Sequence, residues 1–254
     1  MSMFCYQCQE ASKGIGCNVM GVCGKNPEVA NLQDLLVYAT KGLAEVIVKG
    51  KLDVNQLPTA NHRLITNLFI TITNANFDPQ AIEGAINDTL KLRDELREQN
   101  NVVDLGHTGL FTVTDRASML QKASLIGVLS TENEDVRSLR ELIIYGLKGM
   151  AAYAEHAYNL GEEDPSIYAF MFEALVATMD DNLTADELVP LVLKTGEYGV
   201  KTMALLDKAN TSHYGNPELT EVNLGVRKTP AILLSSHALT AMTQLLEQTA
   251  TTGA

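Results

Sequence analysis

The sequence predicts a mainly α-helical protein, with two tandem three-helix bundles after an N-terminal cysteine loop and, last, the first βα unit of a truncated α/β (Rossmann-like) domain. Three observations predict it. Apolar residues recur every three or four positions over most of the chain, one helical pattern occurs twice, and this periodicity stops near residue 210. The predicted segments are the cysteine loop at 1–28, the first bundle and a linker at 29–132, the second bundle at 133–209, and a connector with the incomplete α/β domain at 210–254.

The first bundle is predicted from three amphipathic stretches. Pro27 can open a helix, Gly50 can end it, and the apolar residues between them keep a helical spacing. Two further apolar series follow over residues 64–75 and 82–96, and the charges around the second are typical of a solvated outer face. A short helix is expected over residues 118–125, inside a less regular linker.

The second bundle is predicted from an internal repeat. Residues 34–44 line up with residues 141–151 at a constant offset of 107, and Tyr, Lys, Gly and Ala keep their register. Two more helical patterns, over residues 167–179 and 185–206, repeat the order seen after the first copy. Two related three-helix units, each burying its apolar stripes on its neighbours, explain this pattern. Chance similarity between amphipathic helices is the alternative.

The C-terminal part has a different pattern. Residues 210–230 are rich in Gly, Pro, Asn and Thr, as in an extended connector. Residues 231–234 form a short apolar run typical of a buried parallel strand, and an amphipathic helix follows. A single strand has no ladder partner, and the returning strand of a βαβ unit is missing. We therefore expect that the chain stops inside a second domain, which a longer parent chain or a separate polypeptide completes.

Composition restricts the partners and the compartment. The 19 basic and 31 acidic residues give a net charge of −12, which disfavours nucleic acid and anionic membranes as general partners. No segment approaches the roughly 18 consecutive apolar residues of a spanning helix, and no secretion signal is recognisable, so a cytoplasmic protein is expected. The sequence also lacks a glycine-rich phosphate loop and the H-E-x-x-H and G-x-S-x-G motifs.

All four cysteines, Cys5, Cys8, Cys17 and Cys23, lie in the first 23 residues. Disulfides within so short a segment would do little for the rest of the chain, so a metal site is favoured. Thiolates bind both zinc and iron–sulfur clusters. Structural zinc usually uses two compact cysteine pairs, whereas only the first pair is compact here, and glycines between the cysteines allow close wrapping. The spacing favours an iron–sulfur cluster, with zinc and unligated thiols as alternatives.

Among the histidines, His237 has the position of a ligand. It follows the predicted strand and precedes a helix, where open α/β sheets place their ligands. A helix-entry histidine without a ligand is the alternative. His62 and His156 fall in helical patterns and are interpreted as surface or packing residues. Tyr38 and Tyr145, with the lysines that follow them, are interpreted as helix packing and surface charge.

Several long segments are distinctive: 3–10 (MFCYQCQE), 21–25 (GVCGK), 27–34 (PEVANLQD), 129–140 (LSTENEDVRSLR), 145–149 (YGLKG), 214–218 (YGNPE) and 222–225 (VNLG). They closely resemble the hybrid-cluster protein family, also known as prismane protein or hydroxylamine reductase, and the resemblance spans essentially the whole chain. It implies a helical domain of two three-helix bundles followed by two α/β domains. The shorter cysteine spacing, as here, is that of members with a [4Fe–4S] cubane.

The resemblance also implies the ligands and the activity. Cys5, Cys8, Cys17 and Cys23 would bind the cubane, and His237 would be a ligand of a second, hybrid [4Fe–2O–2S] cluster. Family members reduce hydroxylamine to ammonia and have been linked to nitric oxide reduction under nitrosative stress. A redox donor protein would supply electrons through the cubane.

One departure from the family pattern concerns the hybrid cluster. Its glutamate, lysine and further cysteine ligands belong to the α/β region that this chain lacks, so as written the chain cannot build the catalytic centre alone. Two alternatives to a reductase follow. The first is a non-enzymatic iron–sulfur module for electron transfer or redox sensing that docks on a separate subunit. The second is a zinc-stabilised helical scaffold.

Overall fold

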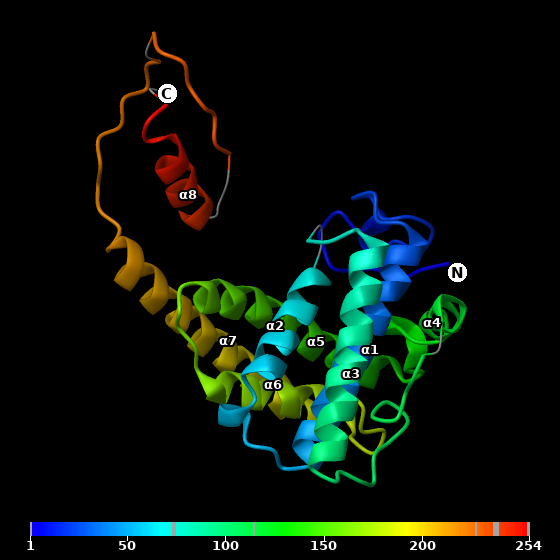
Figure 1. The fold of residues 1–254 in the computed structure, drawn as a ribbon. Coiled ribbons are helices and arrows are strands. Elements are labelled where there is room, and N and C mark those ends of the chain that lie inside the picture. Colours follow the sequence, from blue (N-terminus) through cyan, green and yellow to red (C-terminus); the bar gives the residue numbers. More distant parts are fainter. Residues whose placement is uncertain (1, 73–74, 114, 227, 236–238, 253–254) are drawn as a thin grey trace. The chain divides into compact units, whose positions relative to one another are not determined.

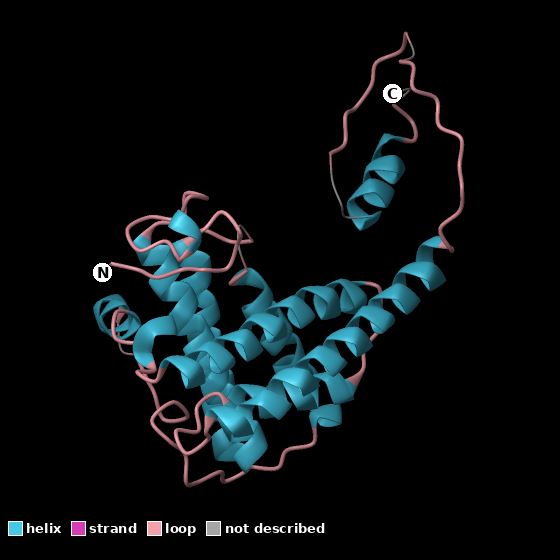
Figure 2. Cartoon of the chain, turned by 180° about the vertical axis from the view of Figure 1, so that it is seen from behind, coloured by secondary structure: helices cyan, strands magenta, loops and turns pink. Residues whose placement is uncertain are grey.

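The computed structural model describes residues 2–72, 75–113, 115–226, 228–235 and 239–252. The chain divides into two compact units, Met1–Gly215 and Asn216–Ala254. Within the described residues the fold is mainly helical, with eight α-helices, and the only β-type pairing is a single bridge between Cys5 and Cys17. Figure 2 shows helices joined by loops and no strands. The prediction of a mainly α protein is therefore confirmed.

The first helical copy begins with α1 (Pro27–Lys49). The Asn26 side chain caps it by accepting a hydrogen bond from the Val29 amide, and Pro27 fits the first turn because its missing N–H has no partner there. α2 (Pro58–Ile70) and α3 (Pro79–Gln99) follow, and both also begin with proline. α3 packs along α1 (Figure 1). α4 (Arg116–Ala123) packs on the same helix.

The second copy repeats these elements at the predicted offset. α5 (Glu134–Asn159) starts 107 residues after α1, and α6 (Pro165–Ala177) starts and ends 107 residues after α2. α7 (Ala185–Tyr214) takes the place of α3, begins with a capping box between Thr184 and Glu187, and packs along α5. The same order of helices with the same spacing supports the internal duplication.

The middle helices pack differently from the expected pair of self-contained bundles. α2 packs mainly against α5, and α6 packs mainly against α1, so each copy contributes its middle helix to the other. α6 is apolar on nearly every side, and such a helix needs cover on more than one face. Its buried residues belong to one core shared by both copies: Ile167, Tyr168, Phe170, Met171, Phe172, Ala174 and Leu175. The two copies are therefore interlocked through this shared core.

The linker between the copies is fixed to α1 by a buried carboxylate. Glu45 accepts hydrogen bonds from the backbone N–H groups of Gly106 at 2.7 Å and Gly109 at 2.9 Å. At Gly42 any Cβ would lie 2.6 Å from the Thr108 carbonyl oxygen, so the glycine lets this loop lie directly on the helix. The loop covers α1 just where its neighbour α3 ends.

The C-terminal unit contains α8 (Leu239–Thr249), as predicted. The predicted strand at residues 231–234 is not formed, and these residues have no regular secondary structure. A strand needs a partner for its backbone N–H and C=O groups, and the described part of this unit supplies none. Among the described helices of the whole chain, none is both long and apolar enough to cross a bilayer.

Candidate functional site

The cysteine loop brings Cys5 and Cys17 together through their backbones. The Cys5 amide donates to the Cys17 carbonyl at 3.0 Å, and the Cys17 amide donates to the Cys5 carbonyl at 2.8 Å. Cys17 is buried beside Met3 and Ala30, so this part of the loop has a small core against α1. Its Sγ accepts a hydrogen bond from the Ser12 amide at 3.4 Å. The pairing joins the first and third cysteines of the motif.

The second half of the loop is a tight turn around Cys23. The Gly21 amide donates to the Lys25 carbonyl at 2.8 Å, and Gly24 has a positive φ of 91° that favours glycine. A Cβ on Gly21 would lie 3.1 Å from the Cys23 Sγ, so the glycine leaves room beside this sulfur. Cys23 is exposed, in contrast to Cys17.

The chemistry of the donor set fits an iron–sulfur cluster. All four thiols are free of disulfides, and they are soft ligands on one short loop. The Ser12 amide at Cys17 and the Lys25 ammonium, 3.9 Å from the Cys5 Sγ, are donors of the kind that stabilise cluster sulfur. In the part of the chain that the structure describes, no three Cys, His, Asp or Glu side chains are arranged as a metal site. Cluster binding therefore stays a prediction for all four cysteines.

Two tyrosines hold the cysteine loop on α5. The Tyr6 hydroxyl donates to Glu141, with its Oε2 at 3.1 Å and its backbone carbonyl at 3.2 Å. The Tyr145 hydroxyl donates to the Gln7 carbonyl at 3.0 Å, and the Tyr6 and Tyr145 rings lie 6.2 Å apart. Because these contacts join residues more than 130 positions apart, the cysteine loop depends on both copies of the repeat for its position.

Beside this loop lies a cavity of about 570 Å³. Its walls come from the cysteine loop, α1, α5 and the segments before and after them. Four ionisable side chains line it in two equivalent pairs: Asp34 and Lys41 on α1, and Glu141 and Lys148 on α5, each numbered 107 higher than its counterpart. Lys25 adds a third ammonium group. The duplication therefore places two acid–lysine pairs around one cavity.

Burial changes the acidity of these groups. It raises the pKa of Asp34 to about 7, and the positive charge of Lys148 opposes this rise. It lowers the pKa of Lys41 to about 8, against the opposing charge of Glu141. Burial likewise raises the pKa of Glu141 and lowers that of Lys148. Each acid thus interacts most strongly with the lysine of the other copy.

The interpretation of the repeated lysines as surface charge is wrong. Lys148 is 6% exposed, and Lys41 is partly buried in the same cavity. Tyr38 does pack as predicted, edge-on against Phe111 with ring centroids 5.4 Å apart. The repeat keeps an acid seven residues before each lysine, but this spacing does not reveal that the pairs line a cavity. Amphipathic periodicity alone assigns such lysines to the solvent face.

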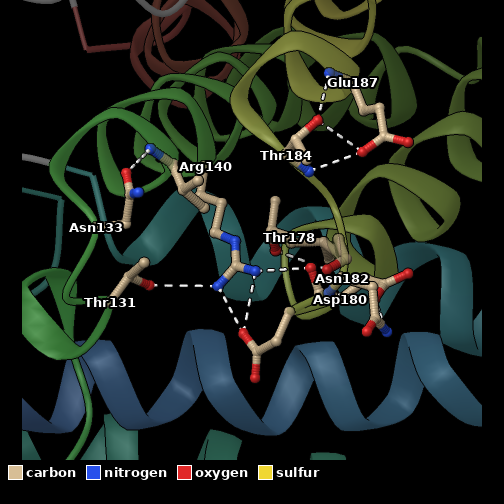
Figure 3. A network of polar contacts seen from close by, with 11 residues as sticks. Thr131, Asn133, Arg140, Thr178, Asp180, Asn182, Thr184 and Glu187 are labelled. Carbon is tan, nitrogen blue, oxygen red and sulfur yellow. Dashed lines mark hydrogen bonds and ion pairs between the residues drawn. The ribbon is translucent and has the colours of Figure 1, made fainter.

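Arg140 forms part of the cavity wall and ties it to the loop before α7 (Figure 3). Its Nη2 donates to the Asp180 carbonyl at 2.7 Å and to Asp181 Oδ1 at 3.1 Å, and its Nη1 lies 3.4 Å from Thr131 Oγ1. Figure 3 shows the guanidinium between Thr131 and Asp180. Its Nε is buried and has no hydrogen-bond partner among the described residues.

The histidines divide as follows. His62 stacks on Tyr158 with ring centroids 4.3 Å apart, and His156 packs edge-on against Phe69 at 5.7 Å, so their interpretation as packing residues is confirmed. His237 lies outside the described residues, and its role as a ligand stays a prediction.

Known proteins resemble this chain along its full length. It is 60% identical to the hydroxylamine reductase of Acetivibrio thermocellus over 253 residues and 55% identical to that of Clostridium perfringens over 260 residues. In both comparisons all of this chain is covered, but only 47% of the relative. The chain therefore spans about half the length of the curated relatives it matches. Residues 3–254 match the profile of the Prismane/CO dehydrogenase family, and the chain belongs to that family.

Proposed function

We propose that the chain is the cluster-binding N-terminal portion of a hydroxylamine reductase of the hybrid-cluster type. The observation that carries the proposal is the set of four free cysteines on one short loop, in a chain that belongs to the family and is 60% identical to a hydroxylamine reductase. Cys5, Cys8, Cys17 and Cys23 hold a [4Fe–4S] cubane. When bound, the cubane supplies one-electron transfer.

The protein around the loop holds and tunes the cluster. The Cys5–Cys17 backbone pairing and the two tyrosine hydrogen bonds to α5 fix the loop before cluster binding. The Ser12 N–H and the Lys25 ammonium place positive charge beside two of the sulfurs. Positive charge beside a cluster favours its more negative, reduced state, so both contacts raise the reduction potential.

The whole protein reduces hydroxylamine to ammonia and water, which consumes two electrons and two protons, and nitric oxide is a second candidate substrate. A redox donor protein supplies the electrons. His237 would be one ligand of a hybrid [4Fe–2O–2S] cluster that would supply the redox chemistry of this reduction, and the C-terminal α/β region would supply the other ligands. The residues after α7, 215–254, are the connector and first βα unit of that region, and the predicted strand forms when its neighbours are present. The expected location is the cytoplasm.

The test uses a chimera in which residues 1–254 are continued by the C-terminal half of the Acetivibrio thermocellus relative. We expect anaerobic production of ammonia from hydroxylamine with reduced viologen as the electron donor. Cys23→Ser should lose most of this activity, because Cys23 is exposed and its replacement removes a ligand without disturbing a core. Val22→Ser is the matched control, because Val22 is also exposed and lies on the same turn.

Two results would contradict the proposal. If the chimera produced no ammonia, the assigned activity would be wrong. If Cys23→Ser were as active as Val22→Ser, the cysteine loop would not relay electrons.

A further inference from the structure

The charged cavity beside the cysteine loop has an arrangement that cluster binding does not explain. Asp34, Lys41, Glu141 and Lys148 face the same space from two equivalent helices. With the residues that the structure describes, Asp34, Lys41 and Lys148 form no ion pair within 4 Å and no side-chain hydrogen bond. Glu141 is hydrogen-bonded to Tyr6. Buried Lys148 and partly buried Asp34 and Lys41 therefore line the cavity without a charged partner among the described residues.

The positive charges also repel each other across this space. Burial is the main cause that lowers the pKa of both Lys41 and Lys148, and the charges of Arg140 and Lys148 lower the pKa of Lys41 further. Lys41 and Lys148 line one cavity, so a single ligand in it can contact both ammonium groups. An anion placed among them would remove this repulsion, and its interaction with each lysine would be strong because little water screens it.

The charge of the cavity lining favours a negative ligand once Asp34 is protonated. Lys25 already donates to Gln33 and lies beside the Cys5 sulfur, so Lys41 and Lys148 are the cations opposed by Asp34 and Glu141. The other acids of the wall contribute little: the Asp181 side chain is 92% exposed and paired with Arg140, and Glu132 is exposed. When the Asp34 carboxyl is protonated, the two lysines outnumber the single charge of Glu141, and the Asp34 O–H becomes a hydrogen-bond donor.

The wall supplies suitable neutral donors and a fixed backbone. The hydroxyl-bearing residues Thr108 and Thr131 line the cavity, whereas the nearby Ser130 and Thr178 hydroxyls already donate to the backbone carbonyls of Gly127 and Leu175. At Gly127, with a φ of 130°, a Cβ would lie 2.7 Å from Asp34 Oδ2, so this loop lies directly on the carboxyl group. A volume of about 570 Å³ exceeds what a compact oxyanion needs, which leaves room for hydrating waters.

We propose that this cavity is a binding site for a compact inorganic oxyanion, held between the ammonium groups of Lys41 and Lys148. The two lysines are equivalent members of the repeat, so the anion is held between α1 and α5. The site borders the cysteine loop, since Cys5 also lines the cavity, but the proposal does not depend on the reductase activity. It gives the duplicated acid–lysine pairs a function in ligand binding.

The test is calorimetric titration of the anaerobically purified, cluster-containing chain with sodium sulfate. Sulfate is a suitable probe because it keeps its double charge between about pH 6 and about pH 8.5, so that any pH dependence comes from the protein. Sodium chloride at equal ionic strength is the reference titration, because it separates binding from screening. We expect one sulfate to bind per chain, with a higher affinity at about pH 6 than at about pH 8.5.

Three variants make the test specific. Lys148→Met should weaken sulfate binding by about tenfold or more, since a buried charge next to the anion is lost. Lys91→Met is the control, because that lysine lies on α3 with 78% of its side chain exposed. Asp34→Asn keeps the shape of the side chain but removes its negative charge, so this variant should bind sulfate more tightly than the unchanged chain at about pH 8.5.

Two kinds of result would overturn the proposal. The first is no sulfate-specific heat at about pH 6 with either the unchanged chain or Asp34→Asn. The second is equal affinity in Lys148→Met and Lys91→Met. Asp34→Asn keeps the test decisive even if Lys148→Met folds poorly, because an increase in affinity cannot result from misfolding.

Discussion

Replacing Cys17 with serine separates the role of the cysteine loop from that of the helical core. Cys17 is 4% exposed, and its Sγ accepts one weak hydrogen bond from the Ser12 amide. Serine can accept the same bond, and the backbone pairing with Cys5 does not involve the side chain. The remaining cost is the burial of a hydroxyl group in place of a thiol, about 1–2 kcal/mol of unfolding free energy.

The helices should not depend on this residue. Both large hydrophobic cores are built without any cysteine, and all eight α-helices of the described chain lie outside the cysteine loop. The Cys17→Ser variant should therefore lose its iron and sulfide but keep nearly all of its far-ultraviolet circular dichroism. Iron and sulfide analysis beside the dichroism spectrum checks both expectations. Collapse of the helical signal would refute the independent core, and full retention of iron would refute Cys17 as a ligand.

Three further substitutions test the packing and the electrostatics. Glu45→Gln replaces one of the two carboxylate oxygens that accept the Gly106 and Gly109 N–H groups by an amide NH₂, which donates. Urea denaturation should show that the unfolding free energy falls by about 2–3 kcal/mol. An unchanged midpoint would contradict the buried carboxylate contact. Gly127→Ala should cost about 1–3 kcal/mol because alanine is strained at a φ of 130°, and a more stable variant in thermal unfolding would be incompatible with this backbone. The pKa of Asp34 is raised from 3.8 in the unfolded chain to about 7 in the folded protein, so between these pH values the folded state holds a proton that the unfolded state has lost. The unfolding free energy therefore falls as the pH rises from about 4 to about 7, by at most about 4 kcal/mol. Asp34→Asn should remove this loss when urea unfolding is compared at both ends of the window, and equal slopes for the two proteins would show that the carboxyl is not buried.

The helices were predictable because their signals are local. Pro27, Pro58, Pro79 and Pro165 all occupy first turns, and the apolar spacing that follows them sets the buried faces. The repeat was predictable for the same reason, because it shows directly as the likeness between residues 34–44 and residues 141–151. The packing partners of α2 and α6 were not predictable from the sequence. Both helices have apolar faces that fit either copy, and only tertiary packing decides that α2 packs on α5 and α6 on α1.

The cysteines were recognisable from their spacing, whereas the cavity was not. Lys41 and Lys148 look like solvent-facing lysines on amphipathic helices, and their burial follows from the cysteine loop and the linker lying over α1 and α5. Those loops are fixed by contacts such as Tyr6 to Glu141 and Glu45 to Gly106, whose partners are far apart in sequence. No local pattern encodes such contacts. The strand at residues 231–234 failed for a related reason, because a strand depends on neighbours outside its own segment.

The most direct test of the central claim is iron and acid-labile sulfide analysis of the anaerobically purified chain, read beside its visible absorption spectrum. A cubane on Cys5, Cys8, Cys17 and Cys23 predicts about four irons and four sulfides per chain, with a broad brown absorption that dithionite bleaches. Zinc without sulfide, in a colourless protein, would contradict electron transfer through the cysteine loop and would identify it as a structural metal site.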